Sequence, residues 1–312
     1  MSAVAEEKVQ KQSDATEDSC ASCGIAGVDD IKLKGCTGCH LVKYCGVKCQ
    51  RDHRPQHKKE CKKRAAELRD EILFKQPESR CEGDCPICCL PLPMDFEKVT
   101  AMACCCKIIC NGCDVANKIH EIRDGNLKEN CAFCRQTPPL TDEEIEASYL
   151  KRMEVNDPVA FCQMGKLRYE EGNYSDAFDY SSKAAELGDI VSHYNLSIMC
   201  RKAQGVEKDM KKSIFHLEEA AIGGELNARA NLGCTEWKSG RYERAVKHYL
   251  IAAKMGDDGS LKNLKEIYGT GYVSKEDFAA ALREHQAAVD ATKSPQREEA
   301  EKYLEFASKE AA

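Results

Sequence analysis

The sequence predicts two small cysteine-rich modules that fold around metal ions, followed by an all-helical repeat solenoid. Three observations lead to this fold class. Eighteen of the 21 cysteines lie between Cys20 and Cys134. They occur largely in pairs separated by two or three residues, a spacing that suits tetrahedral metal ligation. Beyond these clusters cysteine is sparse, alanine is frequent, and a glycine-ending phrase returns at intervals of 36 and 32 residues, which is typical of stacked helix pairs.

Composition places the chain among globular proteins of a reducing compartment. Its 312 residues are 42% hydrophobic and 31% charged, with a net charge of -6 that does not indicate a nucleic-acid-binding chain. Residues 1–18 are polar and acidic and predict a disordered tail. No apolar stretch resembles a secretory signal or a membrane helix, so we expect an intracellular protein, cytoplasmic and/or nuclear, without a membrane partner. In that setting dense cysteines indicate metal rather than disulfides.

The first module, residues 19–61, contains eight candidate ligands within the 42 residues from Cys20 to Cys61. They are Cys20, Cys23, Cys36, Cys39, Cys45, Cys49, His57 and Cys61. Two-residue gaps let a tight turn direct both sulfurs to one metal, and the three-residue gaps place both ligands on one face of a helical turn. So short a segment cannot build an apolar core, so metal binding, worth on the order of 10 kcal/mol or more, must supply the folding free energy.

The segment CTGCHLVKYCGVKCQRDHRPQHKKEC resembles the second half of a MYND zinc finger. The resemblance implies cross-bracing, with one zinc held by Cys20, Cys23, Cys45 and Cys49 and the other by Cys36, Cys39, His57 and Cys61. MYND fingers bind proline-containing peptides, and Arg54 stands where the family usually has a groove-building tryptophan. His40 and His53 are expected to be spare imidazoles.

Residues 62–80 predict a helical linker, with helix-forming residues over 62–76, and residues 81–137 form the second cysteine-rich module. The ligand set that we favour is Cys85, Cys88, Cys104, Cys105, Cys110, Cys113, Cys131 and Cys134. Cys106 is an alternative to Cys104, since a one-residue gap also makes a workable pair. Cys81 and Cys89 are expected to be free thiols. With the first module, this predicts about four zinc ions per chain.

The second array resembles a RING finger with all-cysteine ligands. Cross-bracing would then place Cys85, Cys88, Cys110 and Cys113 on one zinc, and Cys104, Cys105, Cys131 and Cys134 on the other. RING ligases hold a ubiquitin-conjugating enzyme on an apolar surface. The resemblance implies that Ile87, Arg135 and a central helix over residues 114–122, with Val115 and Ile119 on one face, form such a surface. A planar guanidinium suits Arg135 for contacting two partners at once.

A linker helix over residues 138–155 leads to helical repeats over residues 156–292. The phrases SKAAELGD, LEEAAIGGE and IAAKMGDDG end at Gly188, Gly224 and Gly256 or just after them, and each glycine is expected to be a left-handed C-cap. A longer loop from Gly205 has Asp209 as the N-cap of the next helix. This region resembles the Sel-like subclass of tetratricopeptide-type repeats. Trp237, Tyr169, Tyr194 and Tyr249 are expected in the core, and residues 293–312 predict a capping helix.

The residues leave three function hypotheses and no self-contained catalytic site. The first is a zinc-binding adaptor for protein–protein interactions, with the repeats as scaffold. The second is a RING-type ubiquitin ligase that recruits a ubiquitin-conjugating enzyme to substrates held by the repeats. The third, nucleic-acid binding through the basic run at residues 58–64, is the least favoured, because such a run is usually a solvated helix face.

Overall fold

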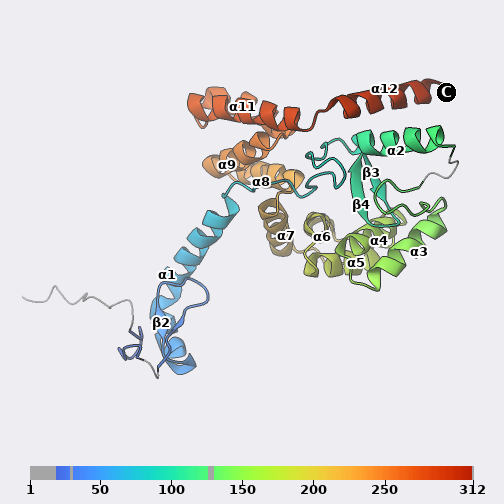
Figure 1. Cartoon of the computed structure of the whole chain (residues 1–312). Helices are drawn as coiled ribbons and strands as arrows, with labels where there is room; N and C mark the ends of the chain where they lie inside the picture. Colours follow the sequence, from blue (N-terminus) through green and yellow to red (C-terminus); the bar gives the residue numbers. More distant parts are fainter. Residues whose placement is uncertain (1–18, 29–30, 126–129, 311–312) are drawn as a thin grey trace, which may run out of the picture. The chain divides into compact units, whose positions relative to one another are not determined.

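The computed structural model describes residues 19–28, 31–125 and 130–310 and divides the chain into two compact units (Figure 1). The first unit ends at Leu73 and the second begins at Phe74. The predicted tail at residues 1–18 lies outside the described residues. Among the helices that the structure describes, none is both long enough and apolar enough to cross a membrane.

The first unit consists of a short strand pair followed by one long helix. Strand β1 (Lys34–Gly35) pairs antiparallel with β2 (Lys43–Tyr44), and α1 runs over Val47–Leu73. The helix predicted for residues 62–76 is therefore the second half of a helix that begins inside the first cysteine module, and it ends three residues earlier than expected. Pro55 lies within α1, where it removes one backbone donor without ending the helix.

The second unit begins with a hairpin and a helix that carry the second cysteine array. A short 3-10 turn, η1 (Phe96–Lys98), precedes β3 (Val99–Met102), which pairs antiparallel with β4 (Lys107–Cys110). Helix α2 (Asn111–Arg123) follows at once. The core of this second array contains its buried cysteines together with Leu92, Met102 and Ile109. The helix predicted over residues 114–122 is thus present, with Val115 buried and Ile119 half-buried.

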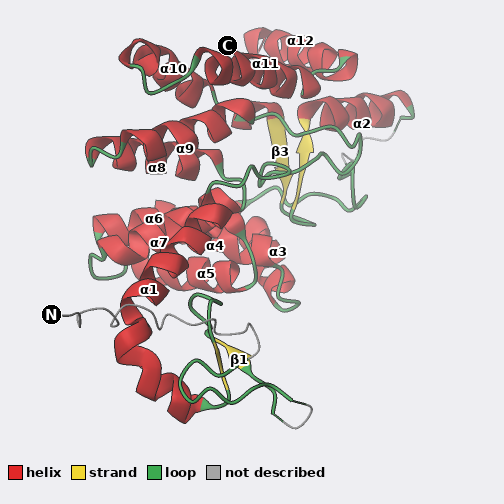
Figure 2. Cartoon of the chain, turned by 90° about the vertical axis from the view of Figure 1, so that its left-hand side faces the viewer, coloured by secondary structure: helices red, strands yellow, loops and turns green. Residues whose placement is uncertain are grey.

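The repeats are pairs of helices, stacked as Figure 2 shows, and each of the helices α4 to α9 has 13 residues. The paired helices are α4 (Pro158–Glu170) with α5 (Tyr174–Glu186), α6 (Ile190–Lys202) with α7 (Met210–Ile222), α8 (Leu226–Lys238) with α9 (Tyr242–Lys254), and α10 (Asp258–Ile267) with α11 (Lys275–Ala291). A short turn, η2 (Tyr268–Thr270), follows α10. Tyr249 is buried in the last core cluster and Trp237 packs against it, whereas Tyr169 and Tyr194 are half-buried.

The recurring glycine and the acidic residue after it join successive pairs. Gly188, Gly224 and Gly256 have φ of +94°, +90° and +102°, which confirms the expected left-handed caps. Asp189 and Asp257 then act as N-caps, because their carboxylates accept backbone hydrogen bonds at 2.6 Å from the third residue of the following helix. Glu225 caps α8 in the same way. The expected cap at Asp209 is also present, at 2.9 and 3.0 Å from two backbone amides.

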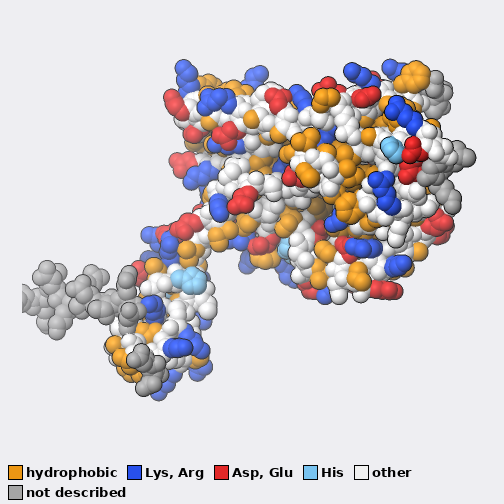
Figure 3. All heavy atoms as spheres, viewed as in Figure 1, with side chains coloured by type: hydrophobic (Ala, Val, Ile, Leu, Met, Phe, Trp, Pro, Cys, Tyr) orange, Lys and Arg blue, Asp and Glu red, His pale blue; other side chains and the backbone are white. Residues whose placement is uncertain are grey.

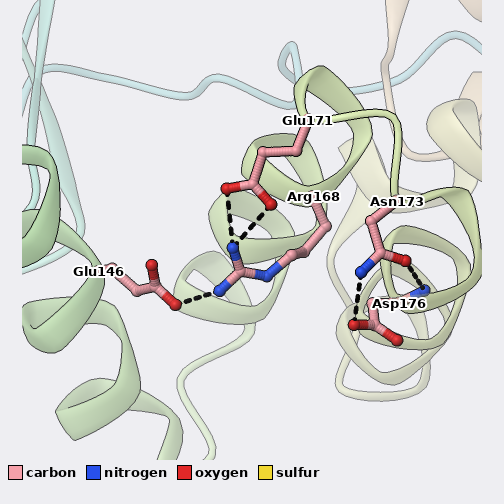
Figure 4. A network of polar contacts seen from close by, with 5 residues as sticks. All are labelled: Glu146, Arg168, Glu171, Asn173 and Asp176. Atoms are coloured by element: carbon pink, nitrogen blue, oxygen red, sulfur yellow. Dashed lines mark hydrogen bonds and ion pairs between the residues drawn. The ribbon is translucent and has the colours of Figure 1, made fainter.

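Helix α3 (Asp142–Met153) connects the second cysteine array to the repeats. It packs against α4, and Figure 4 shows how Arg168 of α4 reaches both Glu146 of α3 and Glu171 at the end of its own helix. The Arg168 guanidinium lies 2.8 Å from both carboxylate oxygens of Glu171. Beside this network, the Asn173 side chain contacts Asp176 at 2.8 Å and caps α5.

Residues 74–94 lie on the repeat edge that carries the glycine caps. The Phe74 ring packs 4.8 Å from that of His248 on α9. The Cys81 backbone amide donates to the Gly224 carbonyl at 3.4 Å, and a Cβ at Gly256 would come within 3.4 Å of Met94. The segment that links the two cysteine arrays therefore covers the C-terminal ends of α7 and α9.

Helix α12 (Pro295–Glu310) packs against α2 of the second cysteine array (Figure 1). The sequence predicts a helix that caps the repeats over residues 293–312, and the structure instead shows one that joins the module near its metal cluster. The physical reason is a buried side chain, Arg297, which donates to backbone carbonyls of the module and is only 5% exposed.

Candidate metal centres

The structure brings sixteen side chains together in four groups of four. Within each group the potential ligand atoms all lie within 4.8 Å of one another. The groups are Cys20, Cys23, Cys45 and Cys49; Cys36, Cys39, His57 and Cys61; Cys85, Cys88, Cys110 and Cys113; and Cys104, Cys105, Cys131 and Cys134. These are the groups that the two resemblances imply, and both modules interleave their pairs along the chain.

In the first unit, helix α1 supplies three of the eight side chains and the strand region supplies the rest. The sulfurs of Cys23 and Cys45 are 3.6 Å apart, and those of Cys45 and Cys49 are 3.5 Å apart. In the other group the Cys39 sulfur lies 3.2 Å from His57 Nε2. Because His57 and Cys61 are four residues apart on α1, one helical face presents both to the same point.

The spare histidines of the first unit stay outside both groups. The His53 ring stacks on that of His57 with centroids 5.6 Å apart, and His53 Nδ1 contacts the buried Tyr44 hydroxyl at 3.0 Å. His53 is therefore placed to fix the orientation of the His57 ring, the imidazole of the group with Cys36, Cys39 and Cys61. His40 is exposed and has a positive φ of 56° at the turn before β2.

In the second unit, the β3–β4 turn and the start of α2 carry the inner cysteines of the two groups. The Cys88 and Cys110 sulfurs are 3.8 Å apart. In the neighbouring group Cys105 and Cys131 are 3.9 Å apart. The turn thus serves one group, and the β4–α2 junction serves the other.

The structure resolves the choice within the run of three cysteines. The Cys104 sulfur lies 3.5 Å from that of Cys134, whereas Cys106 turns away and packs with Tyr149 and Met164. Cys106 has a φ of +54°, a backbone conformation that reverses the chain at this point. Of the two further thiols, Cys81 is half-buried, and its burial raises the pKa of the thiol, whereas Cys89 is exposed.

These distances fit zinc better than disulfides. Four sulfurs at about 2.3 Å from one zinc ion lie roughly 3.8 Å from each other, which matches the separations of 3.5 to 3.9 Å. A disulfide needs sulfurs at about 2.05 Å. All 21 cysteines fall among the described residues, and each is a free thiol. The four groups are therefore compatible with metal binding.

One thiol in each group is unusually easy to ionise. Burial opposes ionisation, but backbone amides of the surrounding turn outweigh it and lower the pKa of Cys20 to about 6 and of Cys85 to about 7. Backbone amides of its own turn likewise lower the pKa of Cys131, and two backbone amides together with His57 lower that of Cys36 to about 6. Each is the first cysteine of a two-residue-gap pair. Because the thiolate is the metal-binding form, the turns prepare a charged ligand in every group.

The expected conjugating-enzyme contacts share one shallow hollow beside α2. Its volume is about 510 Å³, and Ile87, Arg135, Asn117 and Ala132 are among the residues that line it. Ile87 is 41% exposed, and the Arg135 guanidinium donates to the Asn117 side chain at 2.6 Å. Gln296 of α12 also lines this hollow. The buried Val115 makes no part of its lining, contrary to the surface expected from residues 114–122.

The family comparisons identify the first and last parts of the chain. The family model of the MYND finger matches residues 20–61. Residues 20–61 form a MYND finger. This finger is a zinc-binding module. The model of the Sel1 repeat matches residues 160–189, 190–225 and 240–257. The first two matches coincide with the helix pairs α4–α5 and α6–α7, and the third covers α9. Neither matching model describes a RING finger, and residues 62–159 remain outside both.

Similar curated proteins and structures are distant. The chain is 24% identical to the mouse (Mus musculus) protein DAP3-binding cell death enhancer 1 and 23% identical to its rat (Rattus norvegicus) counterpart. Each match covers 50% of this chain and 38% of the relative, so it spans well under half the length of those proteins. Among solved structures, a Sel1 repeat protein from Oxalobacter formigenes is 25% identical with a TM-score of 0.42, covering 57% of this chain and 75% of that one. A protective antigen of uropathogenic Escherichia coli is 24% identical with a TM-score of 0.39, covering 47% and 33%.

Sequence reasoning missed the residues that surround the metal groups. Tyr44 and His53 flank the finger's histidine, and Arg297 contacts the sulfur of Cys88 from 209 residues away. Ligand spacing carries no signal for such neighbours, because they need no fixed separation from the cysteines they touch.

Proposed function

We propose that the protein is an intracellular, zinc-dependent adaptor that joins protein partners. The observation that carries this proposal is the presence of a MYND finger and Sel1 repeats in one chain, two module types that act by binding protein segments. The similarity to a protein whose name states that it binds DAP3 supports the same kind of role for the matched half of this chain. None of the 21 cysteines, all of which the structure describes, forms a disulfide, which suits a reducing compartment, cytoplasmic and/or nuclear.

The finger offers a basic surface to its partner. Residues 19–64 contain eleven Lys and Arg but only four Asp and Glu, although the whole chain has a net charge of -6. Figure 3 shows Lys and Arg side chains around this part of the chain. Arg54, which replaces the family's tryptophan, is exposed on α1. We therefore expect the finger to select acidic, proline-containing segments over purely apolar ones, because charge complementarity favours association.

The repeats offer an edge that residues 74–94 do not cover. The first residues of α5, α7 and α9 are Tyr174, Met210 and Tyr242, which are 36%, 45% and 36% exposed. They recur with the repeat and lie at the opposite helix ends from the covered glycine caps. Aromatic residues and methionine are enriched at interfaces, so this ladder is the surface that we assign to a second partner.

The adaptor proposal is tested by selecting peptides on the zinc-loaded full chain and measuring their affinities. Finger-binding peptides should be acidic and contain proline, and replacing Arg54 and Lys58 by Glu should weaken them at least tenfold. Peptides for the repeats should lose affinity in Met210→Asp and Tyr242→Asp chains but not in a Lys183→Asp chain, whose altered side chain is exposed near the end of α5 opposite Tyr174. Failure to select any peptide, with both modules folded, would refute an adaptor role.

A second candidate function is that of a RING-type ubiquitin ligase. The observation that favours it is the meeting of Ile87 and Arg135 in one hollow beside α2. The exposed apolar side chain would contact a ubiquitin-conjugating enzyme, and the guanidinium would contact enzyme and ubiquitin together once released from Asn117.

Autoubiquitination with a panel of purified conjugating enzymes tests the ligase candidate. Activity should fall at least tenfold in Ile87→Ala and Arg135→Ala chains. It should persist in an Ile122→Ala chain, because Ile122 is an exposed residue of α2 that does not line the hollow. Inactivity with every enzyme of the panel would leave the adaptor alone. Binding of nucleic acid at low salt, lost in a Lys62→Ala, Lys63→Ala chain, would instead support the least favoured hypothesis.

A further inference from the structure

Arg297 is a buried cation, and its neighbours in the described part of the chain include no paired carboxylate. The residue lies in the first turn of α12 and is only 5% exposed. Among the described residues no carboxylate forms an ion pair with it. Burying an unpaired guanidinium is strongly unfavourable, so its surroundings must provide compensating negative charge.

The guanidinium reaches into the loop that carries the first cysteine pair of the second module. One terminal nitrogen donates to the Pro91 carbonyl at 2.7 Å, and the other donates to the Leu90 carbonyl at 3.2 Å. The second nitrogen also lies 3.4 Å from the Cys88 sulfur. The Arg297 guanidinium is therefore in direct contact with a candidate ligand sulfur.

The required anion is the metal-bound group itself. One zinc ion with four thiolates has a formal excess of about two negative charges, and hydrogen bonds to the sulfurs are the usual way that surrounding residues stabilise such a site. We infer that Arg297 is an outer-sphere partner of the metal held by Cys85, Cys88, Cys110 and Cys113, so that metal binding and docking of α12 stabilise each other. Arg297 is a positioning residue and does not ligate the metal.

The residues around Arg297 allow α12 to pack closely against the start of α2. Gly112 lies between Cys110 and Cys113, and a Cβ there would come within 2.9 Å of Arg297 Cγ and 3.1 Å of its Cα. The Gln296 side chain donates to the Gly112 carbonyl at 3.1 Å, and Lys98 pairs with Glu301 of α12 at 2.9 Å. Helix α12 is therefore held by contacts around the group of Cys85, Cys88, Cys110 and Cys113.

Zinc release from the full-length, zinc-loaded chain tests the inference. An Arg297→Gln chain should release one of its zinc ions to a chromogenic chelator about 10 to 100 times faster than the unaltered chain, while the others leave at their usual rate. Arg297→Lys, which keeps the charge, should restore part of the difference. Arg283→Gln, an exposed arginine on α11, is the matched control and should release zinc normally.

Alkylation with a thiol reagent during release identifies the group concerned. In the Arg297→Gln chain, early labelling should fall on Cys85, Cys88, Cys110 and Cys113. Equal release rates for the two chains, early labelling of another group, or a zinc content of only two ions per chain would each overturn the inference. None of these outcomes depends on partner binding, so they are distinct from a failure of the adaptor.

The unaltered chain provides a measurement that does not require a folded variant. Linkage is reciprocal, so removal of this zinc must loosen α12 as much as loss of α12 loosens the zinc. As chelator is titrated, hydrogen exchange in residues 295–310 should rise together with alkylation of Cys88. Protection of α12 that persists after Cys88 is fully labelled would contradict the coupling.

Discussion

At the scale of single residues, His248 is the side chain whose protonation state matters most for the repeats. It is fully buried on α9, and neither ring nitrogen has a hydrogen-bond partner in the part of the chain that the structure describes. Burial, together with the nearby Arg229 and Arg244, lowers its pKa to about 3. The Phe74 ring covers it, with Arg244 and Lys247 above that ring. The folded protein therefore holds a neutral imidazole among positive charges.

This burial predicts acid sensitivity with a defined sign. The folded pKa lies below the unfolded value of about 6.5, so the unfolded chain takes up the proton first and stability declines as pH falls below about 6.5. Each pH unit costs about 1.4 kcal/mol until the folded group titrates, or about 2 kcal/mol by pH 5. A His248→Phe chain should lose less stability over that range in urea unfolding. A His120→Gln chain, altered at an exposed histidine, should keep the original slope, and an unchanged slope in His248→Phe would contradict the assignment.

At the scale of elements, the loop between α6 and α7 shows how one glycine sets the repeat geometry. This loop, residues 203–209, is longer than the connections between α4 and α5 and between α8 and α9, and Gly205 turns it with a φ of +71°. A Cβ at Gly205 would lie 1.9 Å from the Tyr174 carbonyl oxygen. The loop thus packs directly on the start of α5, and only a residue without a side chain permits this contact.

Two glycine substitutions separate this steric effect from backbone strain. Gly240 has nearly the same conformation, with a φ of +75°, but a Cβ there meets nothing within 4 Å. Gly240→Ala should cost about 1 kcal/mol from the left-handed backbone alone. Gly205→Ala should cost about 1 to 3 kcal/mol more because it also creates a clash. Thermal unfolding of the two chains measures the difference, and equal losses would show that the loop yields without cost.

Local patterns made the elements predictable, and long-range packing limited that prediction. The Gly-Asp and Gly-Glu junctions could be recognised because a cap and its helix are adjacent in sequence, and the ligand pairs because their spacing is short. The Cys104–Cys106 ambiguity needed the structure, since only packing against Tyr149 and Met164 turns Cys106 away. The position of α12 was missed for the same reason, because a single arginine in a polar helix has no sequence pattern that indicates its partner.

At the scale of the whole molecule, metal should control the two modules and leave the repeats largely independent. We expect native mass spectrometry to find about four zinc ions per chain, one for each group of four ligands. Chelation should unfold the MYND finger and the second module, because neither has enough apolar core to fold alone. Most helical circular dichroism should remain, since α4–α11 pack on one another. Two zinc ions per chain, or collapse of the repeat helicity on chelation, would contradict this division.

The contact between Arg297 and Cys88 also has a consequence for synthesis. The two residues are 209 positions apart. At about 5–20 residues per second, a ribosome needs roughly 10 to 40 seconds to cover that distance. For the last 163 residues of that distance, after Cys134 has been made, the second module has all its cysteines while Arg297 does not yet exist. Zinc supply and translation speed therefore both determine how long the thiols of the second module stay unprotected. We expect these thiols of the nascent chain to be most susceptible to oxidation before α12 is made.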